Sequence, residues 1–110
     1  MFISPSIMPE KFINVKGAKI RVIEEGEGKP VFLFHGARFN AETWVNTGTV
    51  NAIVQAGFKA VSVDFPGYGK SERGNYTILS EFIRDLVYTL GVSKAYYLGA
   101  SMGGEAVLGF

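Results

Sequence analysis

The sequence predicts an α/β fold, in which a mainly parallel β-sheet with flanking helices is preceded by an antiparallel hairpin. Short apolar or β-branched runs alternate with helical patterns along most of the chain, and this alternation is typical of strands joined by right-handed crossovers. The first two runs, 12–15 and 18–24, alternate apolar with polar residues and are separated by the turn signal Lys16-Gly17. With 110 residues, 47% of them hydrophobic, the chain can build one globular core.

The first strands differ in their patterns. In the second hairpin strand the apolar residues Ile20 and Val22 alternate with the polar residues Lys19 and Arg21. A loop rich in glycine and proline follows, and after it residues 31–34 are continuously apolar. A run of this kind indicates a central parallel strand that is buried on both faces.

The remaining elements alternate in type. In order they are a helix over 41–56, a strand over 58–63, a helix over 77–90, a buried strand over 95–98, and a helix that has barely begun where the sequence stops. The first of these helices takes Asn40 as N-cap and Gly57 as its stop, with Gly48 inside it as a weakening residue. Gly91 ends the second helix, which has the most regular apolar spacing.

Composition excludes several classes of partner. Eleven basic and ten acidic side chains are interspersed without runs, so nothing indicates binding to nucleic acid, an anionic membrane or a polyanion. The chain has no cysteine and one histidine, which excludes disulfides and a histidine-based metal cluster within it. We therefore expect a small-molecule partner and no metal.

No targeting signal is predicted from the sequence. The first twelve residues lack a basic segment followed by an unbroken apolar one, and prolines interrupt them, so no signal peptide is predicted. No stretch of eighteen apolar residues occurs, so no membrane span is predicted. The lack of cysteine makes the cytoplasm the expected location.

The motif with the clearest chemistry is Gly99-Ala100-Ser101-Met102-Gly103, a G-x-S-x-G sequence between a predicted strand and a predicted helix. In that context the serine sits on a sharp turn that exposes its hydroxyl as a nucleophile. Side chains at Gly99 and Gly103 would collide across such a turn. The alternative is a flexible turn without chemistry.

A serine nucleophile needs donors for the oxyanion that its attack creates. The Met102 N–H, at the start of a helix, supplies one. The early loop His35-Gly36-Ala37 follows the first central strand and is expected to approach the serine turn, so the Ala37 N–H is the second candidate. Gly36 would permit the close approach.

Three other titratable residues have competing interpretations. His35 could be the catalytic base, but it precedes the serine, and a histidine that orients its loop by hydrogen bonds is the favoured interpretation. Asp64 is expected to anchor its own loop through backbone hydrogen bonds rather than to act as an acid. Glu105 is expected to satisfy the first turn of its helix.

The loop of residues 64–71 contains glycines and a Gly-Lys-Ser triplet that suggest phosphate binding. Asp64 stands where the first glycine of a phosphate-binding loop belongs, and Glu72 stands where a dinucleotide fingerprint needs its third glycine. Neither nucleotide-binding motif is therefore predicted.

Residues 32–44, 61–72 and 96–107 together resemble the N-terminal half of a compact, single-domain serine hydrolase of the α/β-hydrolase superfamily. The order and separation of FLFHGARFNAETW, VSVDFPGYGKSE and YYLGASMGGEAV match that family. The resemblance implies Ser101 as nucleophile, Ala37 and Met102 as oxyanion donors, and His35 as a structural residue. Serine rather than aspartate at position 101 argues against haloalkane dehalogenase or epoxide hydrolase chemistry.

The family's catalytic acid and histidine match nothing in this sequence. Residues 1–110 are therefore expected to be the N-terminal portion of one domain, incomplete and nearly inactive without a complementary C-terminal polypeptide of the same hydrolase. With that part present, the expected activity is cofactor-free hydrolysis of small carboxylic esters or related acyl compounds. The alternatives are C–C bond cleavage or cofactor-free oxygen chemistry on the same scaffold, and a non-catalytic binding or assembly module. Arg38, Phe39, Trp44 and Tyr68 could line the pocket or simply pack loops.

Overall fold

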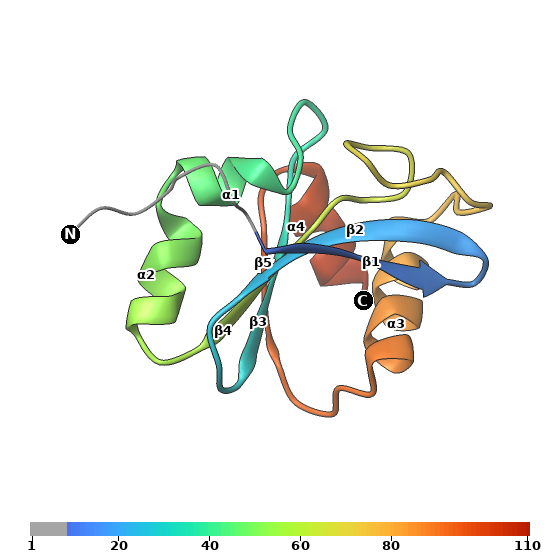
Figure 1. Ribbon diagram of the computed structural model, residues 1–110. Coiled ribbons are helices and arrows are strands. Elements are labelled where there is room, and N and C mark those ends of the chain that lie inside the picture. Colours follow the sequence, from blue (N-terminus) through green and yellow to red (C-terminus); the bar gives the residue numbers. More distant parts are fainter. Residues whose placement is uncertain (1–8) are drawn as a thin grey trace.

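The computed structural model describes residues 9–110 and contains one five-stranded sheet between two layers of helices (Figure 1). The sheet order is β1-β2-β4-β3-β5, in which β3 is parallel to both β4 and β5. The predicted fold class is confirmed. The elements are β1 (Glu10–Val15), β2 (Ala18–Glu25), β3 (Pro30–Phe34), α1 (Glu42–Asn46), α2 (Thr49–Gln55), β4 (Lys59–Val63), α3 (Leu79–Leu90), β5 (Tyr96–Gly99) and α4 (Met102–Gly109).

The predicted hairpin is formed by β1 and β2. Its closing pair is Val15 with Ala18, and the two residues between them, Lys16 and Gly17, have φ angles of 52° and 88°. Positive φ at both turn positions matches the right-handed twist of the strands that the turn connects. β2 then pairs antiparallel with β4, which joins the hairpin to the parallel part of the sheet.

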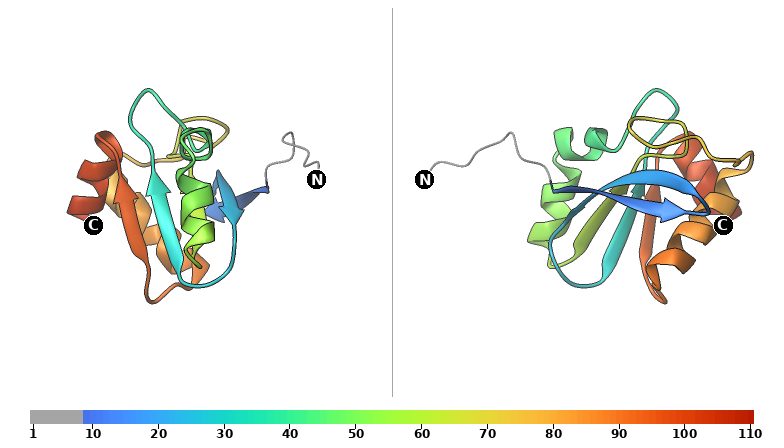
Figure 2. Two further views of the ribbon diagram at one scale, coloured as in Figure 1. Left: turned by 90° about the vertical axis from the view of Figure 1, so that its left-hand side faces the viewer. Right: turned by 45° about the vertical axis from the view of Figure 1, so that its right-hand side comes forward.

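The helices divide between the two faces of the sheet (Figure 2). Phe32 and Phe34 of β3 pack in one core with the apolar side of α3 and with α4. Leu33, between them in sequence, packs on the opposite face against α1 and α2. Side chains alternate across a strand, so β3 is buried on both faces, as its continuous apolar run predicts.

The single helix predicted over 41–56 is wrong, because the chain forms two short helices there. Gly48 has a φ of 83°, a left-handed conformation that ends α1 and precedes α2. Asn40 lies one residue before the helix boundary at Ala41, although its side-chain oxygen still accepts a hydrogen bond from the Glu42 N–H at 2.9 Å.

The predicted burial of β5 is also wrong. β5 was expected to be buried, but Tyr96 and Leu98 are 53% and 43% exposed, since β5 pairs with β3 on one side only within residues 9–110. Arg21 alternates with apolar residues in β2, yet it is fully buried, with its Nε 2.7 Å from the carboxylate of Asp64.

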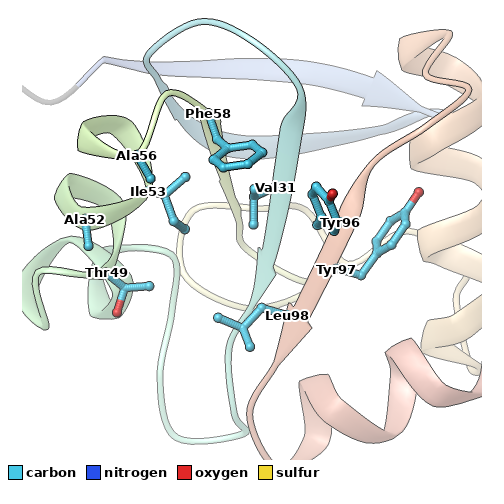
Figure 3. A pocket seen from close by; sticks show the side chains of 9 residues that line it. All are labelled: Val31, Thr49, Ala52, Ile53, Ala56, Phe58, Tyr96, Tyr97 and Leu98. Atoms are coloured by element: carbon cyan, nitrogen blue, oxygen red, sulfur yellow. The ribbon is translucent and has the colours of Figure 1, made fainter.

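The face of β5 that carries Tyr96 and Leu98 borders a groove of about 520 Å³. Figure 3 shows α2 on one side of this groove and β5 on the other. Its lining is almost entirely apolar and comes from Val31, Thr49, Ala52, Ile53, Ala56, Phe58, Tyr96, Tyr97 and Leu98. We call it the β5 groove.

Among residues 9–110, none of the helices has both the length and the apolar character that crossing a bilayer requires. The prediction that no signal peptide is present concerns mainly residues 1–8, which lie outside the described residues.

Candidate active site

Three parallel strands bring the predicted site residues to one edge of the sheet. Phe34, the last residue of β3, is in register with Val63 of β4 and Gly99 of β5. The segments that follow these strands therefore begin side by side, at the carboxyl edge where open α/β sheets place their ligand sites.

The segment after β5 turns sharply at Ser101. This residue has φ 55° and ψ −114°, and Lys16 in the hairpin turn is the other residue among 9–110 that has a positive φ without being glycine. A side chain in that region of φ/ψ space costs on the order of 1–3 kcal/mol, and such strain clusters at functional sites. Ser101 is exposed and directly precedes α4.

Two glycines allow this turn to exist. A Cβ atom on Gly99 would overlap the backbone of Gly103, and a Cβ on Gly103 would overlap the carbonyl group of Phe34. In both cases the obstructing atoms belong to the backbone, which cannot rotate away. The turn from β5 into α4 therefore requires glycine at position 99, and the close approach of α4 to the end of β3 requires glycine at position 103.

The segment after β3 passes close to the serine. A Cβ atom built on Gly36 would lie 3.5 Å from the Cβ of Ser101 and 3.4 Å from the carbonyl oxygen of Ala100. The next residue, Ala37, is exposed. Within residues 9–110, neither the Ala37 N–H nor the Met102 N–H donates to a backbone carbonyl, which leaves both donors for another acceptor.

His35 uses both ring nitrogens to hold this corner together. Its Nδ1 donates to the carbonyl oxygen of Gly36 at 2.7 Å, and its Nε2 accepts from the Phe65 N–H at 3.0 Å. The ring is fully buried, and this burial lowers its pKa below the ordinary value. A neutral ring with both nitrogens engaged has no free atom to take a proton from Ser101, which argues for the structural interpretation.

Tyr68 joins the loop after β4 to the start of α4. Its hydroxyl donates to the sulfur of Met102 at 3.5 Å, and its ring is tilted against that of His35 with 5.2 Å between centroids. Tyr68 is partly buried, so it packs beside the residues whose N–H groups are the oxyanion candidates.

Asp64 anchors its loop through backbone hydrogen bonds, as the sequence predicts. Its Oδ1 accepts from the Ala41 N–H at 2.6 Å, and its Oδ2 accepts from the Lys70 N–H at 2.9 Å. The carboxylate is fully buried and its charge is balanced by Arg21. Glu105 lies in the first turn of α4, but no side-chain cap bond forms there.

Arg21, the charge partner of Asp64, is a residue of this site that sequence reasoning missed. The partners of its guanidinium are Asp64 at 2.7 Å and, at 3.2 Å each, Glu10 and Glu42. Asp64 is 43 residues away in sequence, so no local spacing indicates the pair. The sequence shows Arg21 on an alternating hairpin strand and Asp64 at the end of an apolar strand, and neither position by itself indicates a buried ion pair.

A family model described as the alpha/beta hydrolase fold matches residues 29–108. The chain belongs to the α/β-hydrolase family. This membership confirms the resemblance based on the serine turn and the two loops beside it. Family membership establishes the scaffold, and a scaffold of this kind does not by itself fix the reaction.

Named relatives of this α/β-hydrolase chain differ in what they act on. A putative protein-lysine deacylase, ABHD14B from Pongo abelii, is 43% identical over 57% of the chain and 32% of its own length. The 2-hydroxy-6-oxo-6-(2'-aminophenyl)hexa-2,4-dienoic acid hydrolase of Metapseudomonas resinovorans is 32% identical over 96% of the chain and 38% of its own length. An esterase structure from Exiguobacterium antarcticum has a TM-score of 0.75 at 32% identity and covers 89% of this chain and 38% of that one. The chain spans between 32% and 38% of the length of these relatives.

Proposed function

We propose that this α/β-hydrolase chain carries the nucleophile of an enzyme that hydrolyses small carboxylic esters or related acyl compounds. The observation that carries the proposal is the strained backbone of Ser101, held between glycines beside the Gly36 segment. A hydroxyl presented in this way, next to two unengaged N–H groups, suits attack on an acyl carbonyl.

In the proposed reaction, the Ser101 oxygen attacks the carbonyl carbon while a base accepts the hydroxyl proton. The resulting oxyanion accepts hydrogen bonds from the N–H groups of Ala37 and Met102. Collapse of this tetrahedral intermediate breaks the bond to the alcohol, which leaves with a proton, and forms an acyl ester on Ser101. Attack by water on that ester releases the acid and restores the serine.

The base and the acid that orients it are proposed to come from a complementary C-terminal polypeptide of the same hydrolase. His35 does not suit the role of base, because both of its nitrogens bond to backbone groups. The half-exposed side chains of Tyr96 and Leu98 and the apolar β5 groove give that polypeptide a surface to cover, since soluble proteins avoid exposing an apolar sheet edge. We call the chain together with this part the complemented protein.

The proposal is tested by following the acyl intermediate. The complemented protein is mixed with p-nitrophenyl esters of short acids, quenched, digested and analysed by mass spectrometry. We expect the acyl mass on the peptide that contains Ser101, and we expect Ser101→Ala to lose both this mass and the turnover. Ser93→Ala is the matched control, because Ser93 is exposed in the segment before β5, at the opposite end of that strand from Ser101.

Two results would overturn the proposal. Turnover that survives Ser101→Ala would show that another group carries the reaction. Failure of the unmodified complemented protein to form an acyl mass, with Ser101 unreactive, would favour the non-catalytic binding or assembly module.

A further inference from the structure

The segment of residues 35–41, which carries the Ala37 N–H, is held at both ends by the residues that follow β4. We propose that the buried pair Asp64 and Arg21 positions this segment against Ser101. The pair touches no substrate and acts through the segment, so its members are positioning residues. The catalytic meaning of this inference rests on the proposed function, whereas the positioning itself is a property of the structure.

The far end of the segment is fixed through Ala41, which is fully buried. Its N–H donates to Oδ1 of Asp64 at 2.6 Å, and its carbonyl oxygen accepts from the Ser62 hydroxyl at 2.7 Å. Both polar groups of one backbone unit are therefore bound to side chains from the end of β4. Hydrogen bonds to an ionised acceptor are about twice as strong as neutral ones.

The near end of the segment is His35, and Phe65, the residue after Asp64, holds it in place. The Phe65 N–H donates to Nε2 of His35 at 3.0 Å, and the Asp64 N–H donates to the carbonyl oxygen of Arg21 at 3.0 Å. A displacement of Asp64 would therefore move the contacts at both ends of the segment. Gly36, between them, faces Ser101.

A buried carboxylate keeps its place only if its charge is compensated. Arg21 supplies this compensation with its Nε at 2.7 Å from Oδ2 of Asp64. The other two guanidinium nitrogens bind Glu10 on β1 and Glu42, the first residue of α1, each at 3.2 Å. Because α1 begins where the segment ends, Arg21 ties the hairpin, Asp64 and the start of α1 to one rigid group.

The loop after β4 is shaped around this carboxylate. A Cβ atom on Gly69, whose φ is 54°, would overlap the Asp64 carboxylate. The Ser71 hydroxyl accepts from the Arg21 N–H and donates to the carbonyl oxygen of Asp64, both at 2.8 Å. Asp64 and Arg21 are thus joined by a direct backbone hydrogen bond, by the bridging Ser71 hydroxyl and by their ion pair.

The experiment compares Asp64→Asn with Asp85→Asn in the complemented protein. The carboxylate of Asp64 accepts hydrogen bonds from Arg21 and from the Ala41 N–H. An asparagine at position 64 would turn its amide NH2 group, itself a donor, toward at least one of these two donors. Asp85 is the matched control: it is a partly buried carboxylate on α3 that accepts from the Tyr76 hydroxyl at 2.6 Å, away from the segment. Ser62→Ala is the milder second variant, since it removes the bond to Ala41 and keeps the Arg21–Asp64 pair.

Two readouts are taken on each variant. Amide hydrogen exchange reports whether residues 35–41 open locally, with β3 as the internal reference. The ratio of kcat on an ester to kcat on its thionoester reports oxyanion binding, because donors placed for an oxygen anion serve the larger sulfur poorly. A misplacement of about 1 Å can cost about 100-fold in rate, so we expect Asp64→Asn to lower kcat by about 10- to 100-fold with little change in KM.

The expected result is faster exchange confined to residues 35–41 and a smaller oxygen-to-sulfur preference in Asp64→Asn. Ser62→Ala should show the same changes to a lesser degree, and Asp85→Asn should show neither. Unchanged exchange in both Asp64→Asn and Ser62→Ala would overturn the inference, whatever the activity. Faster exchange in a protein whose unmodified form shows no Ser101 chemistry would support the positioning and overturn the proposed function instead.

Discussion

Lowering the pH from 7.5 to 5.5 should weaken the folded state through His35. The ring is fully buried and its Nε2 accepts the Phe65 N–H. Protonation would turn this acceptor into a donor that faces another donor. Burial lowers the pKa of His35 below its ordinary value of 6.5, so the folded protein resists protonation in this range while the unfolded chain accepts the proton.

The sign and the size of the effect follow from proton binding. Because the unfolded state binds more protons below pH 6.5, stability is fully present above that pH and falls as the pH decreases toward the lowered folded pKa. With an unfolded pKa near 6.5, the loss at pH 5.5 is at most about 1.4 kcal/mol. Glu10 affects stability only at a lower pH than His35. Its hydrogen bonds with Lys70 and Arg21 lower its pKa below the ordinary 4.5, so the stability that it contributes is lost only under more acidic conditions.

The assay is urea unfolding at pH 7.5 and pH 5.5, for the unmodified protein and for His35→Gln. Glutamine can offer an acceptor to the Phe65 N–H without titrating, so the difference between the two proteins isolates His35 from every other group. We expect the unmodified protein to lose about 1 kcal/mol more than the variant. An equal loss in both proteins would refute the account of a neutral, backbone-bound histidine.

Three further predictions concern the free energy of unfolding, measured by urea titration at pH 7.5. Gly103→Ala should cost at least about 2 kcal/mol, because the added Cβ would push α4 away from the carbonyl group of Phe34. Gly48→Ala has open space around it and should cost only about 1 kcal/mol, from left-handed backbone strain. Similar costs for the two variants would contradict the steric argument. Gly69→Ala should cost about 2 kcal/mol because the added Cβ displaces the carboxylate of Asp64. An unchanged free energy of unfolding would show that the loop after β4 can move to make room for the Cβ. Tyr76→Phe removes a 2.6 Å hydrogen bond to a carboxylate on α3 and should cost about 1 kcal/mol; no loss would mean that water replaces the bond.

Local signals predicted most of the fold. The turn at Lys16-Gly17, the apolar run before His35 and the regular spacing that ends at Gly91 each act within a few residues, so they can be recognised without knowing the tertiary structure. The helix predicted over 41–56 fails for a local reason as well, because the left-handed φ of Gly48 divides it into α1 and α2.

Burial was harder to predict, because it depends on which elements lie beyond a strand. β5 has the composition of a buried strand, yet one of its sides has no neighbour within residues 9–110. Arg21 alternates with apolar residues like a solvent-facing side chain, yet Asp64 and two glutamates meet it from distant parts of the sequence. The serine turn was accessible to sequence reasoning because its G-x-S-x-G motif lies within five consecutive residues, and Gly99 meets the backbone of Gly103 inside that motif. The Asp64–Arg21 pair depends on long-range pairing.

Labelling of the complemented protein with a fluorophosphonate, followed by peptide mapping, tests directly whether Ser101 is the nucleophile. This probe reacts with an activated serine, so we expect one label on the peptide that contains Ser101 and none in Ser101→Ala. A folded, complemented protein that leaves Ser101 unlabelled, or that carries the label on another residue, would contradict the assignment of Ser101 as the nucleophile.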